Sequence, residues 1–308
     1  MKRFTKTIGF SVLLAMLLAG CNERNELETP VDNVQQRIAI NVTEEENPVG
    51  TRGIPLNSAA EVTSLGLFCT YTGKEKFHEN LQPAPNKMNN VKMYRVSGTD
   101  HWAYDGADVM WDNTSAADNY TFFAYAPYSS PGNGISIETP LTTLPRLRYK
   151  TPANVADQPD LMIAESRRDI HPTGHPVDLK MKHMLTAVGF TLQGNGQVVT
   201  GLSLTGVITE GIVDIDAAGS NGTWEEVPNS PATIFNVPIA GGSCTADATE
   251  QDLMTGDGYL MMLPQTLSAD AKVTLTFDDN QTKEVRLATS GNLDSWTQGK
   301  RVTYRIVL

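Results

Sequence analysis

The amino-acid sequence predicts an all-β protein built from two β-sandwiches in tandem. Three observations support this prediction. Short segments of alternating or continuous apolar residues recur along the chain, whereas the 3.6-residue period of an amphipathic helix is nearly absent. Turn signals such as Asn195-Gly196 and Asn221-Gly222 separate these segments. The length of 308 residues is enough for about two domains.

The N-terminus has the pattern of a bacterial lipoprotein signal. Basic side chains within residues 2–6 precede an apolar run over residues 8–18, which is too short to span a bilayer comfortably. The run ends in Leu18-Ala19-Gly20-Cys21. This tetrapeptide resembles the lipobox, in which signal peptidase II cleaves before the cysteine and the thiol receives diacylglycerol. We therefore expect Cys21 to carry a lipid anchor, and Asn22 after it favours the outer membrane. The alternative is an ordinary secretory signal with a chance cysteine.

The segment after the signal peptide (residues 1–20) predicts a tether and then a strand. Residues 21–36 are polar and acidic, as in a flexible linker. Residues 37–43 alternate as a short strand, in which three apolar residues share one face. These residues are Ile38, Ile40 and Val42. An acidic run and a loop with Pro48 follow, and Arg52 and Gly53 lie in that loop. A strand with such a loop behind it could be removed without destroying the rest of the chain.

The next segments predict an N-terminal sandwich over residues 37–183. Further strands are expected at residues 63–71, 93–96, 101–104, 109–111, 120–125, 160–165 and 177–183. The apolar segment 120–125 predicts a central strand that ends before Pro127. Residues 73–92 and 128–156 are rich in turn-forming residues, so we expect loops there.

A second series of strands predicts a C-terminal sandwich over residues 184–308. The expected strands are residues 187–192, 198–205, 211–215, 232–237, 258–263, 272–277, 283–287 and 302–308. Residues 246–256 are the one segment for which we expect a short helix.

The net charge argues against nucleic-acid binding, and the cysteine positions predict free thiols. The formal net charge of −11 makes the chain a poor candidate for binding nucleic-acid phosphates, and acidity favours solubility at a surface. Lipidation would use Cys21, which leaves Cys69 and Cys244 in different predicted sandwiches. We expect these two to be separate thiols, mostly buried or inert, although secreted chains often pair their cysteines.

The sequence contains no recognisable enzyme motif. A nucleophile elbow, a phosphate-binding loop, a dinucleotide fingerprint and a pair of catalytic carboxylic acids are all missing, so we expect neither catalysis nor a cofactor. His171 and His175 have the spacing of a metal pair on a helix, but Pro172 and Pro176 exclude a helix there. We therefore expect loop histidines and no metal site.

Two further groups of residues have more than one interpretation. Asp105, Asp108 and Asp112 could bind calcium, but they lack the order of an EF-hand loop, which favours ordinary turn carboxylates. Four aromatic residues close in sequence could form a glycan-stacking platform, although packing in a core is commoner. They are Tyr94, Trp102, Tyr104 and Trp111.

His183 ends an alternating strand and is predicted to be a core or interface histidine.

Four features occur together and in order along the chain. They are the lipobox, the stretch Asp160-Leu-Met-Ile-Ala-Glu165, residues 177–190 with His183-Met-Leu-Thr-Ala-Val, and Leu263-Pro-Gln265 followed by Trp296-x-x-Gly299-Lys-x-x-x-Tyr304-x-Ile-x-Leu308. In this combination the chain resembles the fimbrillin-like lipoproteins of Bacteroidales bacteria. The resemblance implies two transthyretin-like β-sandwich domains of about seven strands each, and a surface subunit of a type V pilus. It also implies other fimbrial subunits, an Arg-specific surface protease and the outer membrane as partners.

The resemblance gives the segment around Arg52 a possible role. In that family a protease cuts after an N-terminal strand, and the exposed groove accepts a strand from another subunit. Arg52-Gly53 matches the position and chemistry of this cut, and residues 38–43 match the strand that is lost. Burial of the three apolar residues in this strand contributes roughly 1.5–3 kcal/mol each, which a donor strand would recover. The alternative is that Arg52 is an ordinary loop arginine.

The end of the chain bears on the position of the subunit in a pilus. The chain ends at Leu308, where the predicted last strand 302–308 also ends. If that strand belongs to its own domain, no spare segment remains to be donated, which suits a subunit at the tip. If it detaches, the subunit suits the stalk. The alternative function is a surface lipoprotein adhesin that binds a host or bacterial protein or glycan without polymerising.

Overall fold

The computed structural model describes residues 36–44, 61–77, 84–112, 115–138, 144–216, 223–227, 232–254, 258–288 and 295–308. The predicted all-β class is confirmed, because strands and turns make up these residues apart from short 3-10 turns such as Val155–Asp157 and Ala240–Gly242. None of the helical segments in this part of the chain has the length and apolarity needed to span a bilayer. The predicted boundary between residues 183 and 184 stays a prediction.

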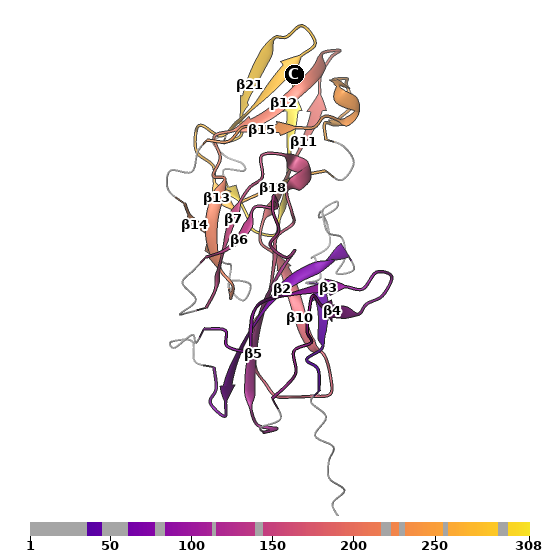
Figure 1. Ribbon diagram of the computed structural model, residues 1–308. Helices are drawn as coiled ribbons and strands as arrows, with labels where there is room; N and C mark the ends of the chain where they lie inside the picture. Colours follow the sequence, from indigo (N-terminus) through magenta and orange to yellow (C-terminus); the bar gives the residue numbers. More distant parts are fainter. Residues whose placement is uncertain are drawn as a thin grey trace, which may run out of the picture. The chain divides into compact units, whose positions relative to one another are not determined.

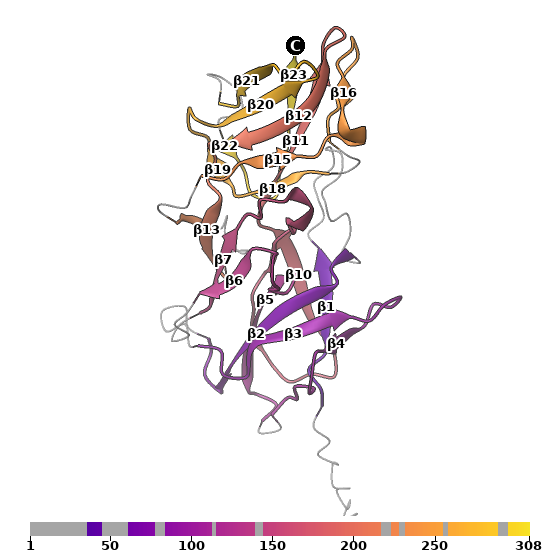
Figure 2. The same ribbon diagram turned by 45° about the horizontal axis from the view of Figure 1, so that its top comes forward.

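The largest sheet lies in the N-terminal part of the chain (Figure 1). Its strands are β1 (Ile40–Glu44), β2 (Ser64–Gly73), β3 (Met88–Arg95), β4 (Trp102–Tyr104), β5 (Asn119–Ala126), β8 (Met162–Ala164), β9 (Arg167–Ile170) and β10 (Val177–His183). The order is β1-β10-β8-β5-β2-β3-β4, with β9 beside β5. All neighbours are antiparallel except β1 and β10, which run parallel (Figure 2).

The central strand β5 is apolar throughout because both of its faces are covered. Tyr120 and Phe122 pack into a core that also contains the apolar side chains of β1, whereas Phe123 and Tyr125 pack into a second core on the opposite face. Every residue of β5 is buried. A strand buried on both faces loses the alternation of a half-exposed strand, which explains the continuous run of aromatic residues.

A second sheet lies beside the first and contains strands that the sequence did not predict. It consists of β6 (Ile135–Glu138), β7 (Arg146–Lys150), β13 (Glu210–Asp214) and β14 (Glu225–Glu226), in the order β14-β13-β7-β6. The expectation of a loop over residues 128–156 is therefore wrong for β6 and β7. The reason is that β7 has only two buried apolar residues, Leu147 and Tyr149, between basic residues. The sheet joins strands from both sides of the predicted domain boundary.

Ion pairs on the outer face stabilise this second sheet. Arg148 lies 2.7 Å from Glu210 on β13 and 2.9 Å from Glu138 on β6, so one guanidinium links three neighbouring strands. Arg146 pairs in the same way with Asp214 and Glu225. The basic residues because of which β7 was not predicted as a strand thus form its cross-strand ion pairs.

The C-terminal part of the chain forms a sandwich of two sheets. One contains β17 (Gln251–Asp252), β11 (Thr186–Gln193) and β18 (Leu260–Met262), with β23 (Arg301–Val307) parallel to β11. The other contains β15 (Phe235–Val237), β12 (Val198–Thr205), β20 (Lys272–Phe277) and β21 (Thr282–Arg286), with β16 (Cys244–Thr245) beside β12. A small pair, β19 (Gln265–Thr266) and β22 (Ser295–Trp296), completes this part. One core contains side chains of both sheets, including Phe190, Leu204 and Leu275.

Several predicted elements differ from the structure in type or extent. The segment 109–111, expected as a strand, has only an isolated bridge at Met110. Residues 246–254 contain turns and β17, so the expected helix over 246–256 is wrong within the described range. Its place is taken by a local turn in which the Asp247 carboxylate accepts hydrogen bonds from the backbone and side chain of Thr249. These bonds lower the pKa of Asp247, and such side-chain bonds compete with helix formation. The strand expected at 93–96 begins earlier, at Met88.

Two glycines with left-handed backbones provide a test of the packing between β12 and β20. Gly206 has a φ of 75°, and a Cβ there would lie 1.9 Å from the carbonyl oxygen of Asp270. Gly196 has a φ of 87°, but a Cβ there would meet no atom within 4 Å. We expect Gly196→Ala to cost roughly 1–2 kcal/mol through its backbone alone. Gly206→Ala adds a collision with the main chain and is expected to cost about 3–5 kcal/mol. Urea denaturation of both variants checks this, and equal losses would contradict it.

Candidate functional site

The first strand lies at the edge of the large sheet and packs its apolar side chains into the core. Ile38, Ile40 and Val42 are buried in the core, while Ala39, Asn41 and Thr43 are more exposed, as the alternation predicts. The register with β10 runs from Ile40 opposite Val177 to Glu44 opposite Met181. Among the described strands, β10 is the one strand partner of β1.

The chain ahead of β1 makes an antiparallel contact of its own. The amide of Ile38 donates to the carbonyl of Val109 at 2.9 Å, and the amide of Trp111 donates to the carbonyl of Gln36 at 2.9 Å. Arg37 and Met110 face each other between these two bonds. We call this contact between residues 36–38 and 109–111 the clasp.

Side chains from β4 and the turn after it add to the clasp. The Tyr104 hydroxyl donates to the carbonyl of Ile38 at 2.8 Å. The Arg37 guanidinium lies 5.8 Å from the centre of the Tyr104 ring and donates to the carbonyl of Trp102 at 2.9 Å. It also lies 3.6 Å from the Asp108 carboxylate. Burial raises the pKa of the Tyr104 hydroxyl above its usual value, so this donor keeps its proton at neutral pH.

The two ends of this segment therefore differ in how they are held. Residues 36–38 have backbone partners in the clasp, whereas residues 40–44 have one strand neighbour and a side-chain bond from Asn41 to Asp178 at 2.8 Å. A cavity of about 750 Å³ lies beside β1 and is lined by residues of β1, β4 and the loop before β10. β1 is thus a buried edge strand with open space along part of its length.

Removal of β1 would uncover a groove with defined chemistry. Its floor is the core that now contacts Ile38, Ile40 and Val42, and one wall is the backbone of β10. Loss of these three side chains from the core costs roughly 1.5–3 kcal/mol each. An uncovered strand edge is also a template for pairing with another extended chain. The chemistry of such a groove is that of recognition of an extended chain.

Three predicted site residues, Cys21, Arg52 and Gly53, lie outside the described residues. Lipidation at Cys21 and cleavage at Arg52-Gly53 therefore stay predictions. Within the described part, the structure brings together the strand residues with the clasp, which sequence reasoning missed. Arg37, the basic residue directly before the first buried apolar residue, was the available signal, but its partners lie more than 60 positions further along the chain.

The aromatic residues near the groove belong mainly to the core. Trp102, Tyr104 and Trp111 are buried, which confirms core packing over a glycan platform for these three. Trp111 packs edge-on against Tyr120 with ring centres 4.8 Å apart. Tyr94 is different, because 43% of its surface is exposed.

The acidic residues near Trp111 are each paired with a cation. Asp105 lies 2.7 Å from Lys92, and Asp112 lies 2.7 Å from Lys87. Asp108 pairs with Arg37, as described above. Ordinary turn carboxylates with separate partners therefore fit these residues better than a shared calcium ion. No group of three or more His, Cys, Asp or Glu residues suited to a metal occurs in the part of the chain that the structure describes.

The remaining titratable residues have structural surroundings. His183 is a largely buried histidine, as predicted, with Nδ1 2.8 Å from the Asp160 carboxylate. His171 contacts the carbonyl of Asp118 at 3.1 Å. Cys69 is buried and Cys244 is half-buried, and both are free thiols, as expected. Burial raises the pKa of both thiols, which disfavours the reactive thiolate.

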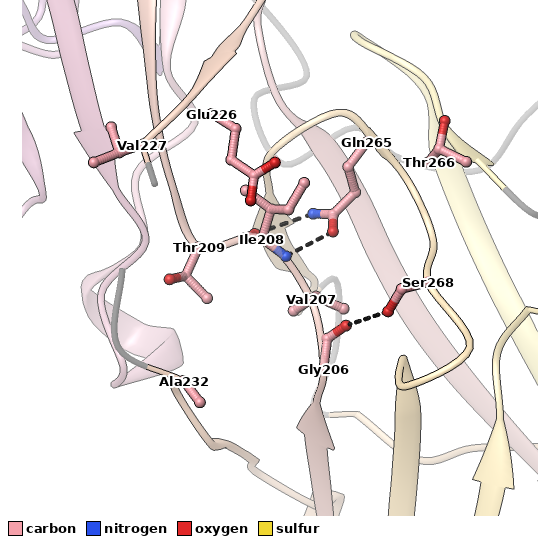
Figure 3. A pocket seen from close by; sticks show the side chains of 10 residues that line it. All are labelled: Gly206, Val207, Ile208, Thr209, Glu226, Val227, Ala232, Gln265, Thr266 and Ser268. Carbon is pink, nitrogen blue, oxygen red and sulfur yellow. Dashed lines mark hydrogen bonds between the residues drawn. The ribbon is translucent and has the colours of Figure 1, made fainter. Parts of the chain in front are cut away.

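A second cavity, of about 420 Å³, lies between the segment after β12 and β19 (Figure 3). Gln265 bridges its wall with one side-chain amide, which accepts from the amide of Ile208 at 2.7 Å and donates to the carbonyl of Ile208 at 3.1 Å. Gln265 thus substitutes for a missing strand partner of this irregular segment. Among the described residues of the lining, Glu226 is the one ionisable side chain.

The role of Gln265 can be tested by removing its polar group. Gln265→Leu replaces the amide by an apolar side chain of similar size and leaves both backbone groups of Ile208 without this partner. We expect a loss of about 2–4 kcal/mol, since each buried unsatisfied group costs about 1–3 kcal/mol. Gln281→Leu on an exposed turn is the matched control and should change stability by less than about 0.5 kcal/mol. Equal effects in denaturant titrations would show that the amide bridge is unimportant.

The chain is similar to several solved structures, one of which supports this architecture. A crystal structure of a candidate cell adhesion protein from Bacteroides uniformis has a TM-score of 0.55 and 14% identity, over 88% of this chain and 92% of that chain. At this identity the similarity shows a common fold. A candidate cell adhesion protein from Bacteroides ovatus has 15% identity and a TM-score of 0.49, over 89% and 91% of the two chains. A fimbrial protein from the same species has 15% identity and a TM-score of 0.40, over 89% of this chain and 49% of that chain.

The family assignment comes from the sequence. No curated protein is significantly similar to the chain. The sequence profile described as fimbrillin-like matches residues 51–308, which is most of the chain and confirms the resemblance seen in its motifs. The protein therefore belongs to the fimbrillin-like family.

Proposed function

We propose that this protein is an adhesive fimbrial subunit that is exported as a lipoprotein and assembled by exchange of its first strand. Family membership already makes it a structural, non-enzymatic protein of the cell surface that associates with fimbrial subunits. The proposal adds the route: Cys21 anchors the chain in the outer membrane, an Arg-specific surface protease cuts at Arg52-Gly53, and a strand of another type V pilus subunit replaces β1.

One observation carries this proposal. Ile38, Ile40 and Val42 fill the core from an edge strand that has a single strand partner over residues 40–44. An edge strand can leave without breaking the order of the remaining sheet. Its departure nevertheless exposes apolar core and the backbone of β10, which makes replacement by another strand favourable.

The same observation supports a sequence of events. Cleavage after Arg52 would break the covalent link between β1 and β2 and leave the contacts of β1 in place. The cut subunit then keeps a filled groove until a competing strand arrives. A subunit that reaches its partner with the groove filled avoids pairing with unrelated strand edges.

Sequencing the N-terminus of subunits extracted from assembled fimbriae tests the proposal. We expect residue 53 as the new N-terminus, and Arg52→Gln should abolish both the cut and assembly. Arg286→Gln, which changes an exposed arginine on β21, is the matched control and should assemble normally.

Assembled subunits that still begin at Cys21 would contradict strand removal. Electron microscopy of the same cells separates the alternative function. If cells that display the protein carry it as single copies without fibres, the protein is a surface adhesin that binds a host or bacterial protein or glycan without polymerising.

The last strand can be tested for a structural role. β23 pairs with β11 over all seven of its residues, and it contributes Val302 and Ile306 to the C-terminal core. We expect a chain that ends at Gly299 to lose cooperative unfolding in thermal denaturation, because removal of two buried side chains and a whole ladder leaves an open core. A truncated chain that folds normally but fails to polymerise would instead show that β23 is the segment donated, as in a stalk subunit.

A further inference from the structure

We propose that the groove occupied by β1 selects its strand through a guanidinium site, so that a replacing strand needs an arginine at the position of Arg37, directly before its first buried apolar residue. The inference rests on the proposed strand replacement and adds the chemistry of the partner. The partner is an extended segment of another subunit with one arginine followed by apolar residues at alternate positions.

The guanidinium site is built from groups that stay when β1 leaves. The Trp102 carbonyl and the Tyr104 ring belong to β4, and Asp108 lies in the turn that follows. They contact Arg37 at 2.9 Å, 5.8 Å and 3.6 Å, respectively. A strand that replaces β1 therefore meets a carbonyl, an aromatic face and a carboxylate already placed around one position.

These three groups suit arginine better than lysine. The Nη2 atom of Arg37 bonds to the Trp102 carbonyl, while its Nη1 atom is the one nearest to Asp108. A planar guanidinium can serve two acceptors through different nitrogens and still present its face to a ring. A lysine ammonium has a single nitrogen, which cannot contact all of these partners at the same time.

Among the described residues, the cation paired with Asp108 comes from the first strand, whereas the neighbouring carboxylates pair with other elements. Asp105 and Asp112, on either side, bind Lys92 and Lys87, which belong to β3 and the chain before it. Asp108 is paired with Arg37. Departure of the first strand leaves the two outer carboxylates paired and separates Asp108 from this cation.

The apolar positions give affinity but cannot fix the register. Side chains alternate with a period of two, so a strand that slips by two residues still directs apolar side chains into the core. The same slip moves the arginine away from Tyr104 by two positions. The guanidinium site therefore specifies which residue of the incoming strand pairs with Val177.

The Tyr104 hydroxyl also binds the strand, but this contact does not depend on the side chains of the strand. It donates to the backbone carbonyl of Ile38, a group that every strand has. This bond therefore holds any strand at the position next to the arginine, and the arginine distinguishes one strand sequence from another.

Peptide competition on the full chain tests the inference. A cleavage site for a sequence-specific protease replaces Arg52-Gly53, and the chain is cut so that the labelled N-terminal fragment remains bound. Three peptides compete with it: residues 37–43 unchanged, the same peptide with Arg37→Lys, and one that carries both Arg37→Gln and Asn41→Arg. The third peptide keeps the charge and moves the guanidinium. We expect the unchanged peptide to displace the fragment at about tenfold lower concentration than either variant, measured by fluorescence anisotropy.

A protein variant identifies the carboxylate. Asp108→Asn should reduce the preference for arginine over lysine several-fold, whereas Asp105→Asn, next to the already paired lysine, should leave it unchanged. Equal displacement by all three peptides would overturn the inference and leave strand replacement intact. Failure of every peptide to displace the fragment would overturn strand replacement itself. The two proposals can also be separated. If the peptides show the expected selectivity but subunits in fimbriae still begin at Cys21, the assembly route is refuted and the guanidinium site is retained.

Discussion

The arrangement of the chain depends on one buried stretch, residues 177–193. Here β10 passes into β11 with only Met184 and Leu185 between them, and both of these side chains are buried. β10 receives β1 in parallel, and β11 receives β23 in parallel. Strands from opposite ends of the described chain are therefore both held by neighbouring parts of one segment. Parallel pairing of this kind joins residues far apart in sequence, so both outer strands depend on long-range contacts.

The sequence predicted strands well where apolar residues carry the signal. β2, β5, β10, β11, β12 and β20 were recognised from alternation or from continuous apolar runs. β6, β7 and β9 were missed because their outward residues are charged or polar and their apolar residues are few. The helix expected after Cys244 failed because Asp247 bonds locally to Thr249, and composition alone does not reveal which local bond forms.

The candidate site could be predicted only in part. The strand and the residues that it buries follow from a period of two, which is a local property. The clasp does not, because Arg37 meets Trp102, Tyr104 and Asp108 only after β3 and β4 have folded back beside the first strand. Gln265 is a similar case. Its place in a motif was visible, but its function as a substitute strand partner for Ile208 depends on tertiary contact.

The clasp also has a consequence for where the chain can be cut. A protease that is specific for arginine has to bind its substrate as an extended segment and take the guanidinium into its own pocket. At Arg37 the backbone on either side is already paired with residues 109–111, and the guanidinium is already bound by three groups. A protease would therefore have to break these contacts before it could cut after Arg37. If the chain is processed by such a protease, as proposed, cutting at Arg37 would report whether the first strand has left its groove.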